Sequence, residues 1–372
     1  MGVLLDVIIA LLGDDDHIVK IGVLVTLVDL EPTLLDTILP LILKLVSDEA
    51  AGVRCALART AGQLLVHCHR GDNKDLQRHM DATLLPLIQR LLHDDDAEVT
   101  SAALRAVSDA TSYSEMRADG GPSAKAILTE KHVLRLLPTL RHLTTNPIWR
   151  VRSSAVEIVP TLLECTYKLD VRVEIAQLCI SLLNDKVDCV RTMAAEALCG
   201  GKCAQSPIVE SSQHELADFE WIDLVVLPHL KACSQSQDYR QRLLSFKIIR
   251  ALFRHSDNLL SNQINTLPKL RQAIIGILQT LTTDPVANVR LNIGRILCNC
   301  AQHFDAAEHA TLTCMLEDLL ALETAKTDGG DRDVRLFTHK ARVYIQNLYS
   351  QNYEKEETDQ EIRKDSSKID RT

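Results

Sequence analysis

Apolar and polar positions along this chain follow the period of a helix, and short polar turns interrupt the pattern at intervals. After the turn at 145–152, Val151, Ala155, Val156 and Val159 fall on one helical face. Val289, Ile293, Ile296 and Leu297 repeat the same offsets after a later turn. The pattern predicts helix–turn–helix hairpins, and because one hairpin cannot bury its apolar stripe alone, neighbouring hairpins must stack.

The turns share a sequence of polar residues that ends in Val and usually Arg. Six copies read SDEAAGVR (47–54), HDDDAEVT (93–100), TNPIWRVR (145–152), NDKVDCVR (184–191), QSQDYRQR (235–242) and TDPVANVR (283–290), with weaker copies at 13–20 and 329–335. Four Leu-Pro pairs, ending at Pro40, Pro86, Pro138 and Pro228, each stand fourteen residues before the last position of a turn. A fixed offset that occurs four times indicates an internal repeat.

Each part of the repeat has a physical reason. Proline fits the first turn of a helix, where its missing N–H has no partner to lose. The turn Asp, five residues before the Val, can accept hydrogen bonds from backbone N–H groups at the start of the second helix. We expect the recurring Arg to pair with a turn Asp of its own or an adjacent repeat, so that the pairs form a ladder.

The turns recur 34 to 52 residues apart, close to the spacing of HEAT and armadillo repeats. We therefore predict an all-α fold, a right-handed α-solenoid of about eight HEAT repeats. The hairpins are expected at roughly 3–35, 36–81, 82–128, 133–170, 171–210, 222–262, 268–310 and 311–350. Polar insertions near 111–130 and at 203–219 are predicted to be loops. The charged tail, residues 351–372, is predicted to be disordered.

Composition agrees with packed helices. Aromatic residues make up only 3% of the chain and glycine is scarce, so Leu, Ile, Val and Ala supply the core. The opening segment is apolar but lacks a basic n-region, and we expect a core helix rather than a signal peptide. The eleven cysteines then indicate a reducing compartment, the cytoplasm with the nucleus as a second location. Seven lie in apolar helical patterns and are predicted to pack in the core: Cys55, Cys165, Cys179, Cys199, Cys233, Cys298 and Cys314.

Charge and motifs argue against several functions. The net charge of −9 disfavours nucleic acid as a partner, and no apolar stretch is long enough to span a bilayer. His67-Cys68-His69 is the densest group of metal-capable residues, but no CxxC or similar pair completes a zinc site. The aspartate runs 14–16 and 94–96 fall in turns, where acidic residues favour a helix N-terminus. Without a nucleotide-binding or catalytic motif, we predict no enzyme, no cofactor and no metal.

Residues 138–350 resemble the last five repeats of the scaffold A subunit of protein phosphatase 2A, repeat by repeat and in order. The resemblance is carried by NPIWRVR (146–152), LCISLLNDKVDCVRTMAAEAL (178–198), VVLPHLKACSQSQDYRQRLLSFKII (225–249), LTTDPVANVRLNIGRIL (281–297) and DRDVRLFTHKARVYIQNL (331–348). It implies a division into N-terminal hairpins at 1–132 and scaffold-like repeats at 133–350.

In that family the turns of the last repeats grip the phosphatase catalytic subunit. The resemblance therefore implies partner binding by the residues at the matching positions: Trp149, Arg150, Lys186, Asp188, Tyr239, Arg240, Val286, Ala287 and Asn288. Exposed Trp, Tyr and Arg are the residue types that anchor interfaces. The alternative is that Trp149 packs against its own hairpin and Arg150 is merely solvated.

The resemblance implies a non-catalytic scaffold or regulatory subunit that binds a phosphatase 2A-type Ser/Thr phosphatase catalytic subunit. It supports a regulatory B-type subunit less well, because the family binds such subunits through more N-terminal repeats. A regulatory HEAT subunit of a phosphatase 4-type enzyme and an importin-like transport adaptor are the alternatives. Armadillo-type importins use repeated Trp and Asn ladders, whereas this chain has only Trp149 and Trp221.

Overall fold

A computed structural model describes most of the chain. The described residues are 2–29, 35–70, 78–111, 114–116, 122–124, 128–166, 168–199, 221–256, 267–326 and 330–348. Their contacts divide the chain into two units, Met1–Val225 and Val226–Thr372. The predicted boundary at 132/133 rested on the resemblance and stays a prediction.

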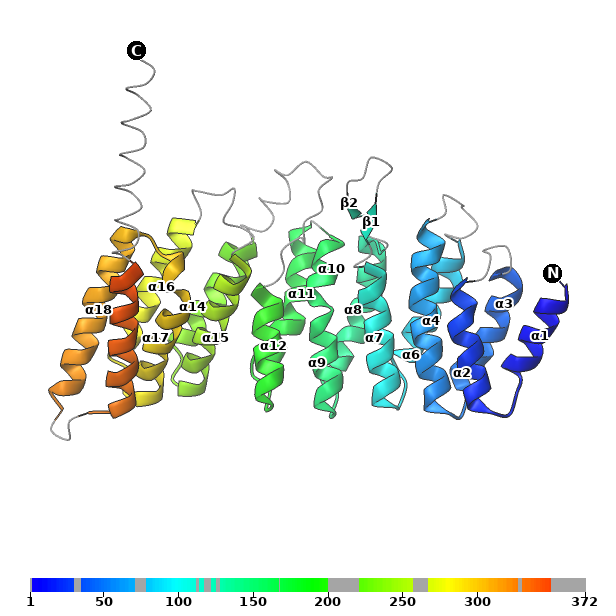
Figure 1. Ribbon diagram of the computed structural model, residues 1–372, viewed down its shortest axis with the longest axis horizontal. Helices are drawn as coiled ribbons and strands as arrows, with labels where there is room; N and C mark the ends of the chain where they lie inside the picture. The colour runs from blue at the N-terminus through cyan, green and yellow to red at the C-terminus, as the bar shows by residue number, and fades with distance from the viewer. Residues whose placement is uncertain are drawn as a thin grey trace, which may run out of the picture. The chain divides into compact units, whose positions relative to one another are not determined.

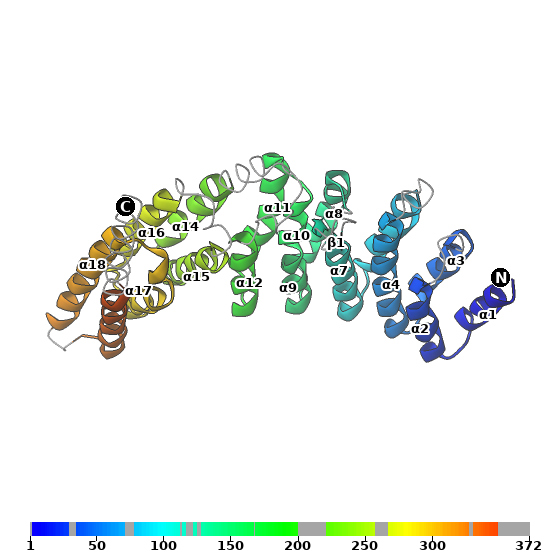
Figure 2. The same cartoon turned by 45° about the horizontal axis from the view of Figure 1, so that its top comes forward.

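Unit 1 is a series of antiparallel helix pairs (Figures 1 and 2). The pairs are α1 (Gly2–Leu12) with α2 (His17–Thr26), α3 (Leu35–Ile42) with α4 (Ala51–Arg70), α6 (Leu85–Leu91) with α7 (Ala97–Thr111), α8 (Glu130–Leu143) with α9 (Trp149–Glu157) and α10 (Val159–Glu164), and α11 (Leu169–Leu182) with α12 (Asp188–Cys199). These pairs match the first five predicted hairpins.

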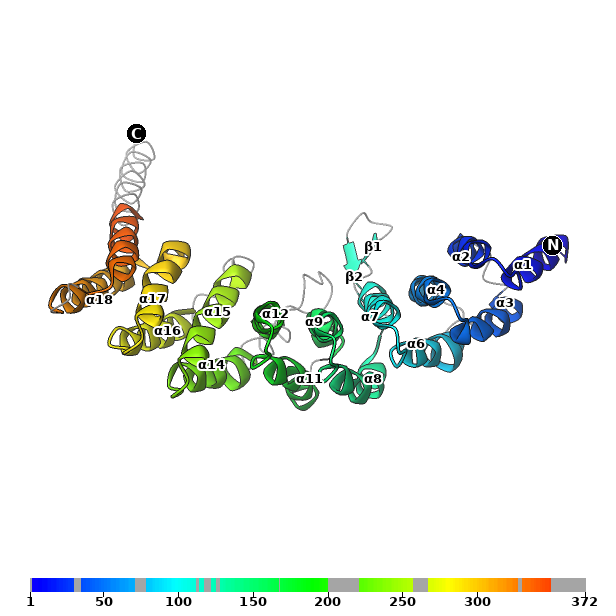
Figure 3. The ribbon, with the colours of Figure 1, turned by 90° about the horizontal axis from the view of Figure 1, so that it is seen from below.

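Two layers of helices make up unit 1, and each layer buries the apolar stripes of the other. Figure 3 shows α3, α6, α8 and α11 in one layer and α2, α4, α7, α9 and α12 in the other. Successive second helices pack directly on one another, α2 on α4, α4 on α7, α7 on α9 and α9 on α12. Leu57, Leu65 and Ile88 are completely buried between the layers. The core is therefore continuous along unit 1, as stacked hairpins require.

Unit 2 repeats the arrangement with three pairs. They are α14 (Leu227–Ser234) with α15 (Tyr239–Ser256), α16 (Leu267–Leu281) with α17 (Ala287–Cys300), and α18 (Ala306–Thr324) with a helix at 332–348. The last pair begins at Ala306 rather than near residue 311. Asp305 and Glu308 form a capping box there, in which each side chain accepts a hydrogen bond from the other residue's N–H.

The Leu-Pro pairs mark the first turn of an α-helix at two of the four positions. Pro40 and Pro138 lie inside α3 and α8. Pro86 and Pro228 are the second residues of α6 and α14, as predicted, and π-helical segments, Met80–Leu84 and Ile222–Val226, lead directly into these helices. A proline removes one backbone hydrogen bond and kinks a helix without ending it when the neighbouring packing holds both halves. The first helix of these hairpins therefore begins before its proline.

The insertion near 111–130 contains a short antiparallel hairpin rather than only loop. Strand β1 (Ser114–Met116) pairs with β2 (Pro122–Ala124), with Ser114 opposite Ala124. The 203–219 insertion and the tail at 351–372 lie outside the described residues. Among the helices that are described, none combines the length and apolarity needed to cross a membrane.

Of the seven cysteines predicted for the core, three are buried, three are half-buried and one is exposed. Cys179, Cys199 and Cys233 are buried, and Cys55, Cys165 and Cys298 are half-buried. Burial raises the pKa of Cys233 to about 11, so its thiol is inert at neutral pH. Cys314 is exposed on α18, which corrects its assignment to the core.

Trp221 is the largest fully buried side chain of unit 1. Its indole N–H donates to the Leu198 carbonyl at 2.9 Å, and the Arg172 guanidinium lies 5.3 Å from its ring centroid. Trp221 therefore anchors the end of unit 1 and is not available as a surface contact.

Candidate functional site: the turns and their exposed side chains

A ladder of ion pairs joins consecutive turns in unit 1. Lys20 donates to Asp48 at 2.9 Å, and the Arg54 guanidinium donates twice to Asp94, at 2.7 and 2.9 Å. The same bidentate geometry joins Arg152 to Asp185, at 2.6 and 2.9 Å. Each cation reaches the acidic residue of the next turn, which confirms the predicted ladder and settles that it runs between repeats.

Unit 2 carries two further rungs. Arg242 pairs with Asp284, and Arg290 pairs with Glu323. Glu323 comes from the end of α18 rather than from the following turn, where Gly329 stands at the acidic position. Gly330, with φ of +63°, brings the chain back so that Glu323 also accepts from the Asp331 N–H at 2.9 Å. A different residue therefore supplies the carboxylate where the repeat lacks one.

Each rung also shapes its own turn. The remaining guanidinium nitrogen of Arg152, Nη1, donates to the carbonyls of Asn146 and Pro147, and Nη1 of Arg54 does the same to Asp48 and Glu49. The ladder carboxylates accept from the N–H two residues on, as Asp185 does from Val187 at 2.8 Å. Each turn is thereby tied both to itself and to its neighbour.

Two ladder aspartates of unit 1 have lowered pKa values in the fold. Burial alone would raise the pKa of Asp185, but hydrogen bonds from Arg152 and from the Val187 N–H bring it below its ordinary value. Opposing effects of the same kind lower the pKa of Asp94, where Arg54 and the Asp96 N–H outweigh burial. The aspartate runs thus serve turns, as predicted: Asp16 caps α2 by accepting from the Ile18 N–H at 2.8 Å.

The predicted contact residues of unit 1 lie at two adjacent turns, which the Arg152–Asp185 ion pair joins. Trp149 and Arg150 are the first two residues of α9, and both are exposed, with 39% of Trp149 accessible. The Arg150 guanidinium carbon lies 5.4 Å from the centroid of the Trp149 ring. Lys186 and Asp188 are exposed at the next turn, where Asp188 also accepts from Arg191 at 2.6 Å. Trp149 therefore does not tuck under its hairpin.

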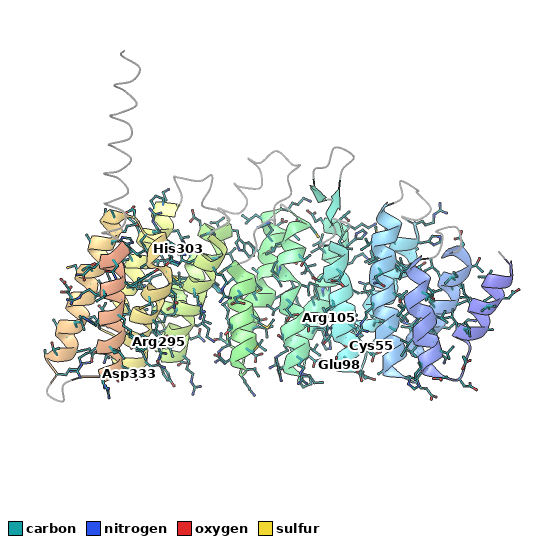
Figure 4. All side chains as sticks on the ribbon, in the orientation of Figure 1. Cys55, Glu98, Arg105, Arg295, His303 and Asp333 are labelled. Atoms are coloured by element: carbon teal, nitrogen blue, oxygen red, sulfur yellow. The ribbon has the colours of Figure 1, made fainter. Side chains whose placement is uncertain are left out.

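Unit 2 repeats this aromatic–arginine arrangement. Tyr239 and Arg240 begin α15, Tyr239 is 41% accessible, and the Arg240 guanidinium carbon lies 5.9 Å from its ring. At the next turn Asn288 is exposed, whereas Val286 and Ala287 are half-buried. Asn288 also accepts from the Asn292 amide. Figure 4 marks this turn edge of each unit by Glu98 in unit 1 and Asp333 in unit 2.

Salt bridges join the ionisable groups of these turns in pairs. In the part of the chain that the structure describes, no three His, Cys, Asp or Glu side chains converge on a metal-sized site. The side chains of His67, Cys68 and His69 lie outside the described residues.

One surface escaped the sequence analysis. Helix α15 carries five basic residues and no acidic one, and it lines a hollow in unit 2. The net charge of the whole chain is negative and gives no indication of this basic helix. A signal was available in the spacing of Lys247, Arg250 and Arg254, which places three cations along one side of a helix.

Comparison with known proteins identifies a fold and no family. No protein-family model matches the sequence. No curated protein sequence matches it. A solved structure of a Kap121p mutant is similar over 94% of this chain and 34% of its own, with a TM-score of 0.64 and 13% identity. The chain is an all-α solenoid of helical repeats.

Two further solved structures are more distant. A chain from a structure of Kap95p with RanGDP aligns with 93% of this chain and 42% of its own, at a TM-score of 0.49 and 13% identity. A designed armadillo repeat protein in complex with a (KR)4 peptide aligns with 70% of this chain and 98% of its own, at 0.37 and 18%. The chain spans about a third of the length of Kap121p, and the likeness carries over the fold alone.

Proposed function

We propose that this chain is a non-catalytic scaffold that binds the catalytic subunit of a phosphatase 2A-type Ser/Thr phosphatase through the exposed side chains of its turns. The observation that carries the proposal is the aromatic–arginine pair at the first two positions of both α9 and α15. The phosphatase catalytic subunit is proposed as the partner because residues 138–350 resemble the last repeats of the phosphatase scaffold family.

Folding gives no reason for an aromatic residue at these positions. Trp149 and Tyr239 stand three residues before the ladder arginines Arg152 and Arg242, where the other turns have residues such as Ala51, Ala97, Asp188 and Ala287. A large amphipathic side chain that stays exposed leaves apolar area in water. The stacked arginine keeps each ring extended and adds a planar donor group, which is the combination found in interface hot spots.

The ladder makes such a surface effective. Arg152–Asp185 ties the Trp149 turn to the Lys186 turn, and Arg242–Asp284 ties the Tyr239 turn to the Asn288 turn. Side chains on a rigid, preorganised edge lose less entropy when a partner binds. Within each unit the contact residues are therefore held in a fixed spacing before binding.

The proposal is tested by calorimetric titration of the chain with purified phosphatase 2A catalytic subunit and, separately, with the phosphatase 4-type subunit. Trp149→Ala is expected to weaken binding by about 2 kcal/mol, roughly thirty-fold, and Tyr239→Ala by a similar amount. Asn288→Ala should lose less. Neither aromatic change should shift the melting temperature, because both side chains lie outside the core.

Leu134→Ala is the matched control, since Leu134 is 43% accessible on α8 and lies away from the turn. No heat of binding with either subunit at micromolar concentration would refute the phosphatase scaffold and leave the importin-like adaptor as the alternative. Binding of the phosphatase 4-type subunit alone would favour that enzyme. Binding that Trp149→Ala and Tyr239→Ala weaken no more than Leu134→Ala would place the contact elsewhere on the chain.

A further inference from the structure

Unit 2 has a strongly basic face on an acidic protein. Apart from its turn residues, α15 carries Lys247, Arg250 and Arg254 and no acidic residue. Helix α17 adds Arg295, while Arg242 and Arg290 belong to the ladder. The helix at 332–348 carries four basic residues and one acidic residue, Asp333. The corresponding helix α7 of unit 1 has mixed charges, with Glu98, Arg105 and Asp109. The basic face is therefore a local feature that the net charge of −9 conceals.

This face is hollowed where the three helices meet. A depression of about 520 Å³ is lined by Lys247 and Arg250 from α15, by Asn292, Arg295 and Asn299 from α17, and by Phe337 from the helix at 332–348. No acidic residue is among its lining side chains. Figure 4 shows Arg295 between His303 and Asp333, nearer to Asp333, and none of the lining residues is one of the turn contact residues. The hollow is thus distinct from the turn surface proposed above.

Phe337 forms an aromatic platform between two cations. The Arg295 guanidinium carbon lies 4.8 Å from its ring centroid and the Lys340 ammonium 5.3 Å. The backbone of residue 337 packs so closely on Gly294 that a Cβ there would lie 2.6 Å from the Phe337 carbonyl carbon. The platform and its cations are therefore fixed by the packing of two helices.

The two asparagines add directional hydrogen bonding. They stand seven residues apart on α17, which places them two turns apart on one side of the helix. Each is oriented by its amide N–H, which donates to the carbonyl four residues earlier, at 2.7 Å for Asn292 and 2.8 Å for Asn299. An amide side chain has further donor and acceptor capacity. Two oriented amides at this spacing suit the alternating N–H and C=O groups of an extended peptide.

We propose that this hollow binds an extended acidic peptide segment of a partner protein. Lys247, Arg250 and Arg295 pair with its carboxylates, Phe337 packs against an apolar side chain, and Asn292 and Asn299 bond to its backbone. A peptide fits better than single-stranded nucleic acid, which stacks on a succession of exposed aromatic rings. Phe337 is half-buried and is the more accessible of the two aromatic rings among the lining residues, because Phe246 is buried.

The test is fluorescence anisotropy with the full chain and a labelled oligoglutamate peptide that carries a central phenylalanine. We expect micromolar binding that weakens as salt rises, and no binding of the matching oligolysine peptide. The double variant Arg250→Ala, Arg295→Ala should weaken binding about ten-fold or more. Arg105→Ala, an exposed arginine of α7, is the control and should leave the affinity unchanged.

A second variant controls for competition between the labelled peptide and an acidic segment of the chain itself. Residues 354–361 read EKEETDQE, so Glu354→Gln, Glu356→Gln and Glu357→Gln together reduce an internal acidic competitor. Lack of binding by both this variant and the wild type would overturn the proposal. Equal affinity of the double variant and Arg105→Ala would also overturn it. Preference for a labelled oligodeoxythymidine over the acidic peptide would assign the face to nucleic acid instead.

Discussion

At the residue scale, one missing rung of the ladder lacks both of its charged residues. Where Thr100 replaces the ladder cation, its hydroxyl donates to the carbonyls of Asp94 and Asp96 in its own turn. The acidic position of the following turn is then the neutral Asn146. A carboxylate left there would lack a charged partner in a largely buried position, which is costly. The neutral pair of positions avoids that cost and keeps the turn.

The Arg152–Asp185 rung should contribute measurably to stability. The two side chains are only 13% and 5% accessible, so Asp185→Ala leaves a nearly buried guanidinium without its carboxylate and should cost about 3 kcal/mol in unfolding free energy. A double-mutant cycle with Arg152→Ala should give a coupling of about 1–2 kcal/mol in urea unfolding. The exposed pair Arg141–Glu174, at 53% and 52% accessible, also joins two repeats of unit 1. Its coupling should stay below about 0.5 kcal/mol. Equal couplings for the two pairs would mean that burial does not govern the ladder.

At the element scale, helix contacts depend on small residues at particular crossings. Gly294 lets α17 approach the helix at 332–348 until their backbones touch, and that approach positions Phe337 beside Arg295. Gly276 in α16 has no such role, because it is exposed and a Cβ there would meet nothing within 4 Å. Close helix packing therefore requires the glycine at 294 but not the one at 276.

Alanine substitutions should separate these two glycines. Gly276→Ala is expected to raise the unfolding free energy by about 0.5–1 kcal/mol, because alanine restricts the unfolded chain and favours the helix. Gly294→Ala should lower it by about 1–3 kcal/mol, because backbone atoms cannot yield as a flexible side chain can. Urea unfolding of unit 2, followed by circular dichroism, measures both. Stabilisation by both substitutions would show that α17 can shift without loss.

At the scale of the whole molecule, the sequence predicts those features that depend on residues close in the chain and that recur in each repeat. Helical stripes, polar turns and the Arg–Asp alternation predicted the hairpins and the existence of a ladder, because each depends on residues close in sequence. The direction of the rungs, the use of Glu323 in place of a turn Asp, and the exposure of Cys314 depend on which helix ends lie next to one another. The basic hollow could not be assembled from the sequence, since three separate helices supply its lining.

The ladder also gives the chain a specific acid sensitivity, which two adjacent aspartates can reveal. Asp94 has a lowered pKa in the fold: burial opposes ionisation, but hydrogen bonds from Arg54 and the Asp96 N–H outweigh it. A carboxyl group with a lowered pKa stabilises the fold fully above the unfolded value of about 3.9 and loses that contribution as pH falls through the folded value. Asp94→Asn should therefore cost about 2 kcal/mol at pH near 6 and much less near pH 2.

Asp95 is the control, because it follows Asp94 in the same turn and is exposed. Asp95→Asn should change the unfolding free energy little at either pH, since an exposed carboxylate gains little from the fold. The measurement is urea unfolding of wild type and both variants across this range, compared as differences so that the general acid destabilisation of the chain cancels. A wild type–Asp94→Asn difference that stays constant with pH would mean that the rung acts through shape and hydrogen bonding rather than through the charge of Asp94. A difference that vanishes at low pH assigns the stabilisation to the ionised rung itself, and the Arg152–Asp185 rung, whose carboxyl pKa is also lowered, would then lose its stabilising effect as pH falls.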